Sequence, residues 1–147
     1  MSSIKSFEDL KVWQKARQLC KEVHQLINQE NFSRDFGLKN QLNRSTGSIM
    51  DNIAEGFGRA GNPEFISFLN IARGSAFEAK SQFYRALDRG YVSAEKFESL
   101  TYMITEIVKM IASLIRHLMT NEHNAFRNKV RDQNRIKSQP PTLNSEL

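Results

Sequence analysis

The sequence has little cysteine and no long apolar run, and these absences exclude several classes of protein. Cys20 is the one cysteine among 147 residues, which excludes an intramolecular disulfide and a cysteine-based zinc cage. Cys20 lies in a helical apolar pattern, where we expect a core residue. The most apolar window, residues 103–119, is interrupted by Glu106, Lys109 and Arg116. A spanning helix needs about 18 consecutive apolar residues, so we expect no membrane partner.

Other signals are missing as well. The first ten residues contain no apolar run, so we expect no secretory signal and a cytoplasmic protein. No segment alternates with the period of two that indicates a strand. We find no cluster of metal ligands, no pair of carboxylates in a plausible pocket and no nucleophile beside a base. We therefore expect no metal, no cofactor and no catalytic residue.

What the sequence does contain is four segments with the three-and-four apolar spacing of amphipathic helices. Hydroxyl and amide caps precede the helices, Pro63 suits a first helical turn, and Gly90 suits a helix end. The predicted helices run from Ser6 to near Asn31, from about Phe36 to Phe57, from Asn62 to Gly90 and from Ser93 to Asn121. We predict an all-α fold, an antiparallel up-down four-helix bundle over residues 1–121.

Charge divides the chain unevenly. The net charge is +5, and residues 124–147 contribute +3 through five basic and two acidic residues. The apolar pattern ends near Asn121, and a polar segment cannot bury enough apolar area to offset its ordering entropy. We therefore expect residues 122–147 to form a flexible basic C-terminal tail that could meet an acidic partner.

Three motifs resemble a known family: SFEDLKVWQKA at 6–16, DNIAEGFGR at 51–59 and FLNIARGSAFEAK at 68–80. They are similar to the four-helix-bundle proteins named after reading frames inside intervening sequences of bacterial 23S ribosomal RNA genes. The resemblance spans Phe7 to about Leu118 and implies a homopentamer, but no established activity. More distantly, the fold looks like the accessory variability protein of diversity-generating retroelements, a basic pentamer that binds nucleic acid and a reverse transcriptase.

Two glycine features need separate interpretations. Residues 56–61 match the dinucleotide fingerprint GxGxxG, which works only when a strand delivers the glycines to the pyrophosphate. Since an amphipathic helix precedes them, we interpret them as a helix end and a tight loop. Gly47 lies inside the second helix, where it costs up to ~1 kcal/mol relative to alanine. It departs from the usual family pattern, and we expect it to pack closely against a neighbour.

Polar residues of the second helix have two interpretations. Asn52, Glu55 and Arg59 lie away from the apolar stripe, so they either form a solvated face with pairs at i,i+4 or contact another helix or subunit. We favour the contact, partly on the resemblance.

The third helix carries a second apolar stripe of Ile66, Phe77 and Tyr84, beside Arg73 and Gly74. One bundle core cannot easily cover both stripes, so we expect this one to meet a neighbouring subunit, with Gly74 allowing close approach. Arg73 is alternatively a structural ion-pair partner, like Glu78.

Nucleic-acid binding is the second predicted interaction. Repeated five-fold, a modest net charge becomes a substantial field, and contacts to phosphates need no base-reading motif. The alternative is that these cations are only solvated. The candidates are Lys11, Lys15, Lys39, Arg44, Arg85, Arg89, Arg127, Lys129 and Arg131.

An enzyme remains a further alternative. Arg17 and His24, and again Arg116 and His123, have the Arg-x6-His spacing that some helical-bundle ribonucleases use on phosphate. No polar residue typical of that motif precedes them, and we attribute the spacing to chance. The favoured hypothesis is a non-enzymatic pentameric scaffold that binds RNA or DNA and docks a partner protein. The alternatives are a purely structural oligomer and a metal-independent ribonuclease.

Overall fold

The computed structural model describes the backbone of residues 4–137 and the side chains of residues 4–121, 132 and 134–136. Within that part the chain is helical and contains no strand, which confirms the predicted all-α class. The helices follow the predicted segments closely, with a short helical turn added at each end of the first long helix. The elements are η1 (Phe7–Asp9), α1 (Lys11–Ile27), α2 (Glu30–Ser33), α3 (Phe36–Phe57), α4 (Asn62–Asp88) and α5 (Ala94–Lys137).

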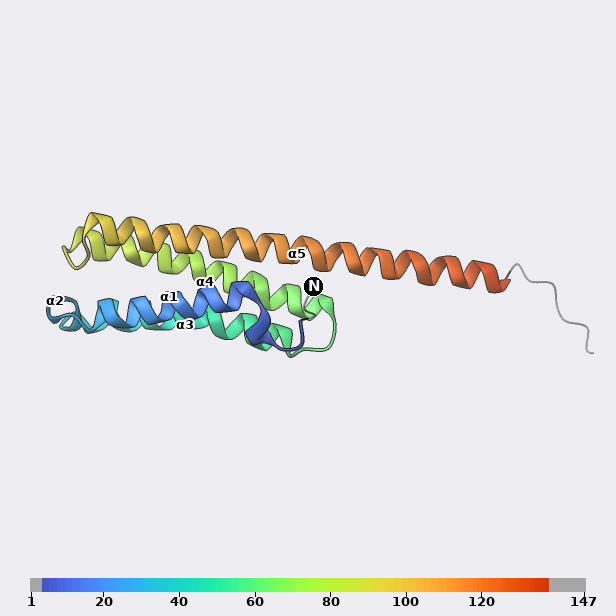
Figure 1. The fold of residues 1–147 in the computed structure, drawn as a ribbon, viewed down its shortest axis with the longest axis horizontal. Coiled ribbons are helices and arrows are strands. Elements are labelled where there is room, and N and C mark those ends of the chain that lie inside the picture. The colour runs from blue at the N-terminus through green and yellow to red at the C-terminus, as the bar shows by residue number, and fades with distance from the viewer. Residues whose placement is uncertain (1–3, 138–147) are drawn as a thin grey trace, which may run out of the picture.

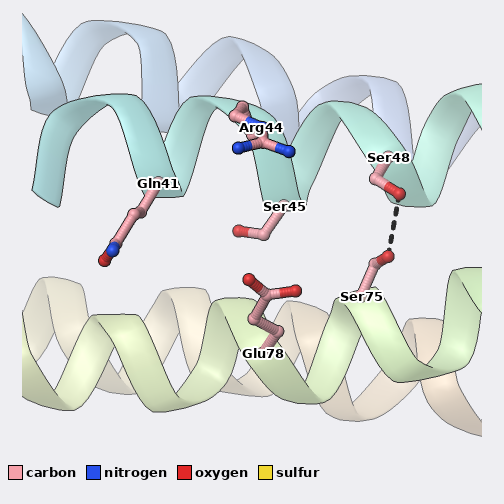
Figure 2. A pocket seen from close by; sticks show the side chains of 6 residues that line it. All are labelled: Gln41, Arg44, Ser45, Ser48, Ser75 and Glu78. Atoms are coloured by element: carbon pink, nitrogen blue, oxygen red, sulfur yellow. Dashed lines mark hydrogen bonds between the residues drawn. The ribbon is translucent and has the colours of Figure 1, made fainter. Parts of the chain in front are cut away.

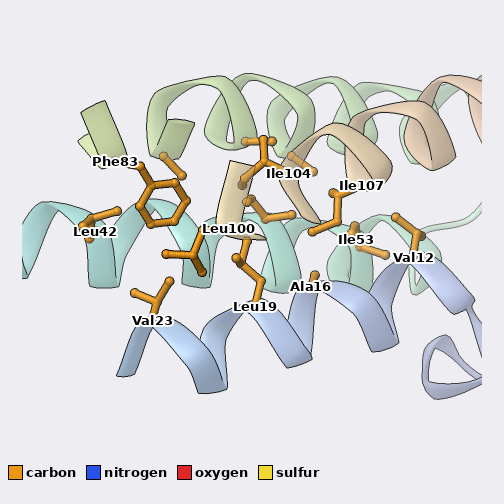
Figure 3. Close-up of a cluster of buried hydrophobic side chains, with 14 of the residues drawn as sticks. Val12, Ala16, Leu19, Val23, Leu42, Ile53, Phe83, Leu100, Ile104 and Ile107 are labelled. Atoms are coloured by element: carbon orange, nitrogen blue, oxygen red, sulfur yellow. The ribbon is translucent and has the colours of Figure 1, made fainter. Parts of the chain in front are cut away.

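The four long helices form an up-down bundle (Figure 1). α3 packs against α4 and α1, and α5 packs against the same two helices. α1 and α4 therefore lie diagonally across the bundle, with the core between them (Figure 3). The solvent-facing sides of α1 and α4 point in opposite directions.

Local signals in the sequence determine where the helices begin and end. The Asp35 carboxylate accepts from the backbone N–H of Leu38 at 3.2 Å and caps α3. Ser93 Oγ accepts from the N–H of Lys96 at 3.1 Å and caps α5. Pro63 lies in the first turn of α4, and Gly90 follows α4 with φ of +75°. The predicted Gly90 helix end is confirmed, whereas Gly61 and not the predicted Asn62 is the N-cap of α4, which places Pro63 second in the helix.

The core is a continuous apolar cluster drawn from all four long helices (Figure 3). α1 contributes Ala16, Leu19 and Val23, each 0–1% exposed. Cys20, predicted as a core residue, is only half-buried, at the edge of this cluster. Its thiol donates to the Thr46 carbonyl at 3.3 Å, and burial raises the pKa of the thiol.

Two of the three glycines of α3, Gly47 and Gly56, differ from the prediction in which of them is closely packed. A Cβ added at Gly47 would meet nothing within 4 Å, so the close packing predicted for Gly47 is wrong within the chain. Gly56 has that role instead, because its backbone lies directly against Phe65 and Phe68 of α4. The sequence shows that a glycine inside a helix lowers its stability. It does not show which neighbouring residue requires the absence of a side chain there.

The last helix is longer than predicted. α5 continues to Lys137, where the sequence pattern predicted irregular chain from residue 122. Leu118 is the last buried residue among those of α5 whose exposure is described, and Figure 1 shows the helix running on past the ends of its neighbours. Extending an existing helix needs no new nucleus, so it can continue without core contacts. Residues 138–147 of the predicted tail lie outside the described residues.

None of the described helices has both the length and the hydropathy required to cross a membrane.

Candidate functional site

The outward side of α4 carries three exposed large apolar side chains. Ile71 is 50% exposed, Phe77 is 55% exposed and Tyr84 is 50% exposed. Gly74 lies between Ile71 and Phe77 along the helix, and a Cβ added there would meet nothing within 4 Å. We call Ile71, Gly74, Phe77 and Tyr84 the α4 face. Apolar side chains around an open glycine suit the close approach of another helix.

The residues of the predicted second apolar stripe of α4 differ in exposure. Ile66 is half-buried and packs against the core, while Phe77 and Tyr84 point toward solvent. The Tyr84 ring also contacts Phe97 of α5 edge to face, with 4.8 Å between ring centroids. The sequence prediction missed Ile71, which lies three residues before Gly74. Its signal was the same three-residue spacing, on the side of the helix next to α3.

Arg73 and Glu78 have partners other than the predicted ion pairs. The Arg73 guanidinium donates to Asn70 Oδ1 at 3.0 Å, and Glu78 accepts from the Gln82 amide at 3.2 Å. Arg73 is half-buried beside the α4 face. Its contact with another subunit stays a prediction.

The polar residues of α3 form local contacts. Arg59 pairs with Glu55 at 2.9 Å, both side chains about half-exposed, and the Arg59 guanidinium lies 5.2 Å from the Phe68 ring centroid. The Asn52 amide donates to the carbonyl and hydroxyl of Ser48, at 2.8 and 2.9 Å. The i,i+4 pair considered as an alternative is therefore present. Glu55 and Arg59 remain exposed and available to a second chain.

A hydrogen-bonded seam between α3 and α4 was not predicted. Ser45 Oγ donates to Gln82 Oε1 at 2.6 Å, and both residues are buried. The hydroxyls of Ser48 and Ser75 meet at 2.8 Å (Figure 2). Small hydroxyl side chains allow the two helices to approach closely, and their hydrogen-bonding groups have partners across the contact. The seam therefore fixes the register between α3 and α4. A groove lies over the seam and is lined by Gln41, Arg44, Ser45, Ser48, Ser75 and Glu78.

The predicted nucleic-acid candidates are spread over several helices. Lys11 and Lys15 lie on α1, Lys39 and Arg44 lie on α3, Arg85 lies on α4, and Arg89 directly follows α4. Arg127, Lys129 and Arg131 lie on the last part of α5, where the side chains are outside the described ones. The structure does not gather this set into one patch, because α1 and α4 lie diagonally across the bundle.

Three of these cations already have partners within the chain. Lys15 pairs with Glu106 of α5. Arg85 donates to Gln41 Oε1 at 2.6 Å. Arg89 pairs with Asp35 at 2.7 Å.

Asp35 gathers contacts at the end of the bundle where α3 begins and α4 ends. Besides capping α3, it accepts from the Tyr91 hydroxyl at 2.9 Å and from Arg89. The Leu38 N–H, followed by the Arg89 and Tyr91 contacts, lowers the pKa of the Asp35 carboxyl. The same hydrogen bond to Asp35 raises the pKa of Tyr91. These contacts tie the start of α3 to the end of α4.

The two Arg-x6-His pairs do not form a common site among the described residues. The Arg17 guanidinium lies over the Trp13 ring, 5.8 Å from its centroid, and the His24 ring lies 3.4 Å from the Asn28 amide. Arg116 is exposed, and the His123 side chain lies outside the described ones. The described residues also contain no group of three or more side chains able to hold a metal.

Comparison with known proteins identifies a family and related solved structures. The family of 23S rRNA-intervening sequence proteins matches residues 8–113. The chain is also similar to a crystal structure of a protein with unknown function from the S23 ribosomal protein family of Bacteroides thetaiotaomicron. The two are 28% identical with a TM-score of 0.65, over 71% of this chain and 97% of that chain. No curated protein matches the chain.

Proposed function

Because the chain belongs to the family of 23S rRNA-intervening sequence proteins, we propose that it is a non-enzymatic homopentameric scaffold. It binds nucleic acid through a basic surface and docks a partner protein such as a reverse transcriptase.

The α4 face carries the self-association part of this proposal. Its apolar side chains are about half-exposed although the opposite side of α4 already fills the core. Burial of apolar surface contributes roughly 25 cal/mol per Å², and a neighbouring helix could approach closely at Gly74. The number of five subunits is taken from the family resemblance, not from the geometry.

Light scattering tests the assembly. We expect a mass of five chains of 17.0 kDa each. A monomeric protein at micromolar concentration would contradict self-association through the α4 face.

Electrostatics support nucleic acid as the ligand. Each chain carries a net charge of +5, and five copies would multiply the field that attracts a polyanion. Arg127, Lys129 and Arg131 lie on the part of α5 that continues beyond the bundle (Figure 1). An extended basic helix can follow a phosphate backbone without reading bases.

Filter binding over a salt series tests this part. Contacts to phosphates predict that log K falls steeply with log salt, and deletion of residues 124–147 should make the slope shallower. An assembly without salt-dependent binding would leave the purely structural oligomer as the function.

The docking of a partner protein rests on the distant resemblance to the retroelement accessory protein. Comigration of the purified chain with a purified retroelement reverse transcriptase in size-exclusion chromatography tests it. Separate elution of the two proteins would contradict it.

A further inference from the structure

The exposed side of α1 differs in charge from every other long helix. Its exposed cations are Lys11, Arg17 and Lys21. The one acid within α1, Glu22, is half-buried and pairs with Lys96 of α5 at 3.2 Å. The remaining exposed residues are Gln14, Gln18, Gln25 and His24. We call this exposed side, from Lys11 to Gln25, the α1 face.

The other long helices mix exposed acids with their exposed cations. α3 exposes two acids beside Arg44, α4 exposes three, and α5 exposes three over the part whose side chains are described. Attraction of a polyanion is weakened where acids alternate with cations, so those surfaces offer less net attraction. The exposed acids are Asp51 and Glu55 on α3, Glu64, Glu78 and Asp88 on α4, and Glu95, Glu98 and Asp132 on α5.

The acids that border the α1 face lie outside it. Before α1, Glu8 is exposed, and Asp9 accepts the backbone N–H groups of Lys5 and Ser6 at 2.9 and 3.1 Å. Glu30, after α1, pairs with Arg34 at 3.1 Å. The α1 face is thus a bounded basic strip along a single helix.

We infer that the α1 face is a contact surface for the phosphodiester backbone of double-stranded nucleic acid. This inference rests on the proposed nucleic-acid binding and names the form of the ligand and the residues that meet it. Ten residues separate Lys11 from Lys21, or about 15 Å along the helix. One strand of a duplex presents about four phosphates over that length. Glutamine amides between the cations can donate to phosphate oxygens or to the 2′-hydroxyls of RNA.

The absence of exposed Phe, Tyr and Trp side chains on α1 favours a duplex over a single strand. Proteins that hold single strands stack bases on exposed aromatic rings. Trp13, which alone represents Phe, Tyr and Trp in α1, is 8% exposed and packs edge to face against Phe7. The α1 face therefore offers charge and hydrogen bonds, but no platform for bases.

The position of α1 makes this contact compatible with assembly. α1 lies diagonally opposite α4, on the other side of the core (Figure 3). The interface of a five-fold ring is heterologous, so the α4 face of one subunit meets a different surface of its neighbour, and the inference requires that this surface is not the α1 face. Several α1 faces on one oligomer could then bind the same duplex, which increases the apparent affinity without new contacts.

The test compares two double variants with equal loss of charge. Arg17→Gln with Lys21→Gln neutralises the α1 face. The control, Lys109→Gln with Arg116→Gln, removes two exposed cations from α5. Each protein is titrated with a 20-base-pair RNA duplex, the same duplex as DNA, and each single strand, over a salt series. Light scattering confirms that the assembly is unchanged.

We expect the α1 variant to bind duplex on the order of 50-fold more weakly at 0.1 M salt, with a slope of log K against log salt shallower by about 2. The control should keep most of the affinity. Arg17→Lys with Lys21→Arg keeps both charges and should restore binding. If RNA and DNA duplexes both respond, the backbone alone is recognised; if only one responds, the α1 face selects that sugar.

Two results separate the inference from the proposed function. The inference is overturned, and the proposed function kept, if the α1 variant and the control weaken duplex binding equally. The same holds if the wild-type protein binds single strands more tightly than duplex. No binding of any nucleic acid by the wild-type protein would overturn the proposed nucleic-acid function, and the inference with it.

Discussion

Gly56 of α3 and Phe68 of α4 are in such close contact that a Cβ added at Gly56 would lie 2.7 Å from the Phe68 Cβ and 2.9 Å from Phe65 Cδ2. Gly56 is the first residue of the GxGxxG match at residues 56–61, near the turn between α3 and α4. The absence of a side chain at residue 56 allows the two helices to converge there.

We predict that Gly56→Ala destabilises the fold although alanine favours helix. The added methyl group must displace Phe68 or the α4 backbone, and such overpacking costs about 1–3 kcal/mol, more than the ~1 kcal/mol gained in helix propensity. Gly47→Ala is the matched control, because its Cβ would meet nothing within 4 Å and should stabilise by up to ~1 kcal/mol. Urea denaturation of both variants measures the difference. Equal effects of the same sign would contradict the packing at Gly56.

The buried Ser45–Gln82 hydrogen bond gives a second prediction. Ser45→Ala removes the donor 2.6 Å from Gln82 Oε1 and leaves that buried oxygen without it, at a cost of about 1–3 kcal/mol. Adding Gln82→Met should recover part of the loss, because neither polar group then remains buried without its partner. The four free energies of unfolding form a double-mutant cycle. A double variant as unstable as the sum of the two single ones would contradict the pairing.

Asp35 predicts how stability depends on pH. Its folded pKa is lowered from the ordinary 3.8, so its contribution to stability is fully present above about pH 4 and is lost as pH falls through the lowered value. Asp35→Asn keeps a capping side chain but loses the charge that faces Arg89. Wild type should therefore be the more stable of the two near pH 7, and their free energies of unfolding should converge in acid. A difference that stayed constant from pH 7 to pH 2 would show that the Asp35 charge contributes nothing.

Much of the fold follows from local signals in the sequence, whereas contacts between helices do not. The three-and-four spacing, Pro63 and Gly90 predict the four long helices because each acts within a few residues of chain. The Ser45–Gln82 seam was missed because serine and glutamine are ordinary on helix surfaces, and their pairing depends on the register between α3 and α4. The length of α5 was missed because the apolar pattern ends where the core ends, while helical hydrogen bonding continues.

The candidate surfaces were predicted only in part, for the same reason. Phe77 and Tyr84 follow from one helix, and their exposure agrees with the predicted second stripe. The basic candidates were chosen as single residues, but which of them share a side depends on the diagonal placement of α1 and α4. Arg17 and Lys21 become notable only when the exposed acids of every helix are compared.

Light scattering of Phe77→Glu measures whether the α4 face joins copies of this chain. A carboxylate at this half-exposed position would be buried unpaired in the interface, at a cost that a modest contact cannot sustain. Phe36→Glu is the control, since Phe36 is an aromatic residue of α3 that is 72% exposed. We predict five chains of 17.0 kDa for wild type and Phe36→Glu, and a single chain for Phe77→Glu. A monomeric wild type, or a Phe77→Glu protein that still assembles, would show that the α4 face does not join the subunits.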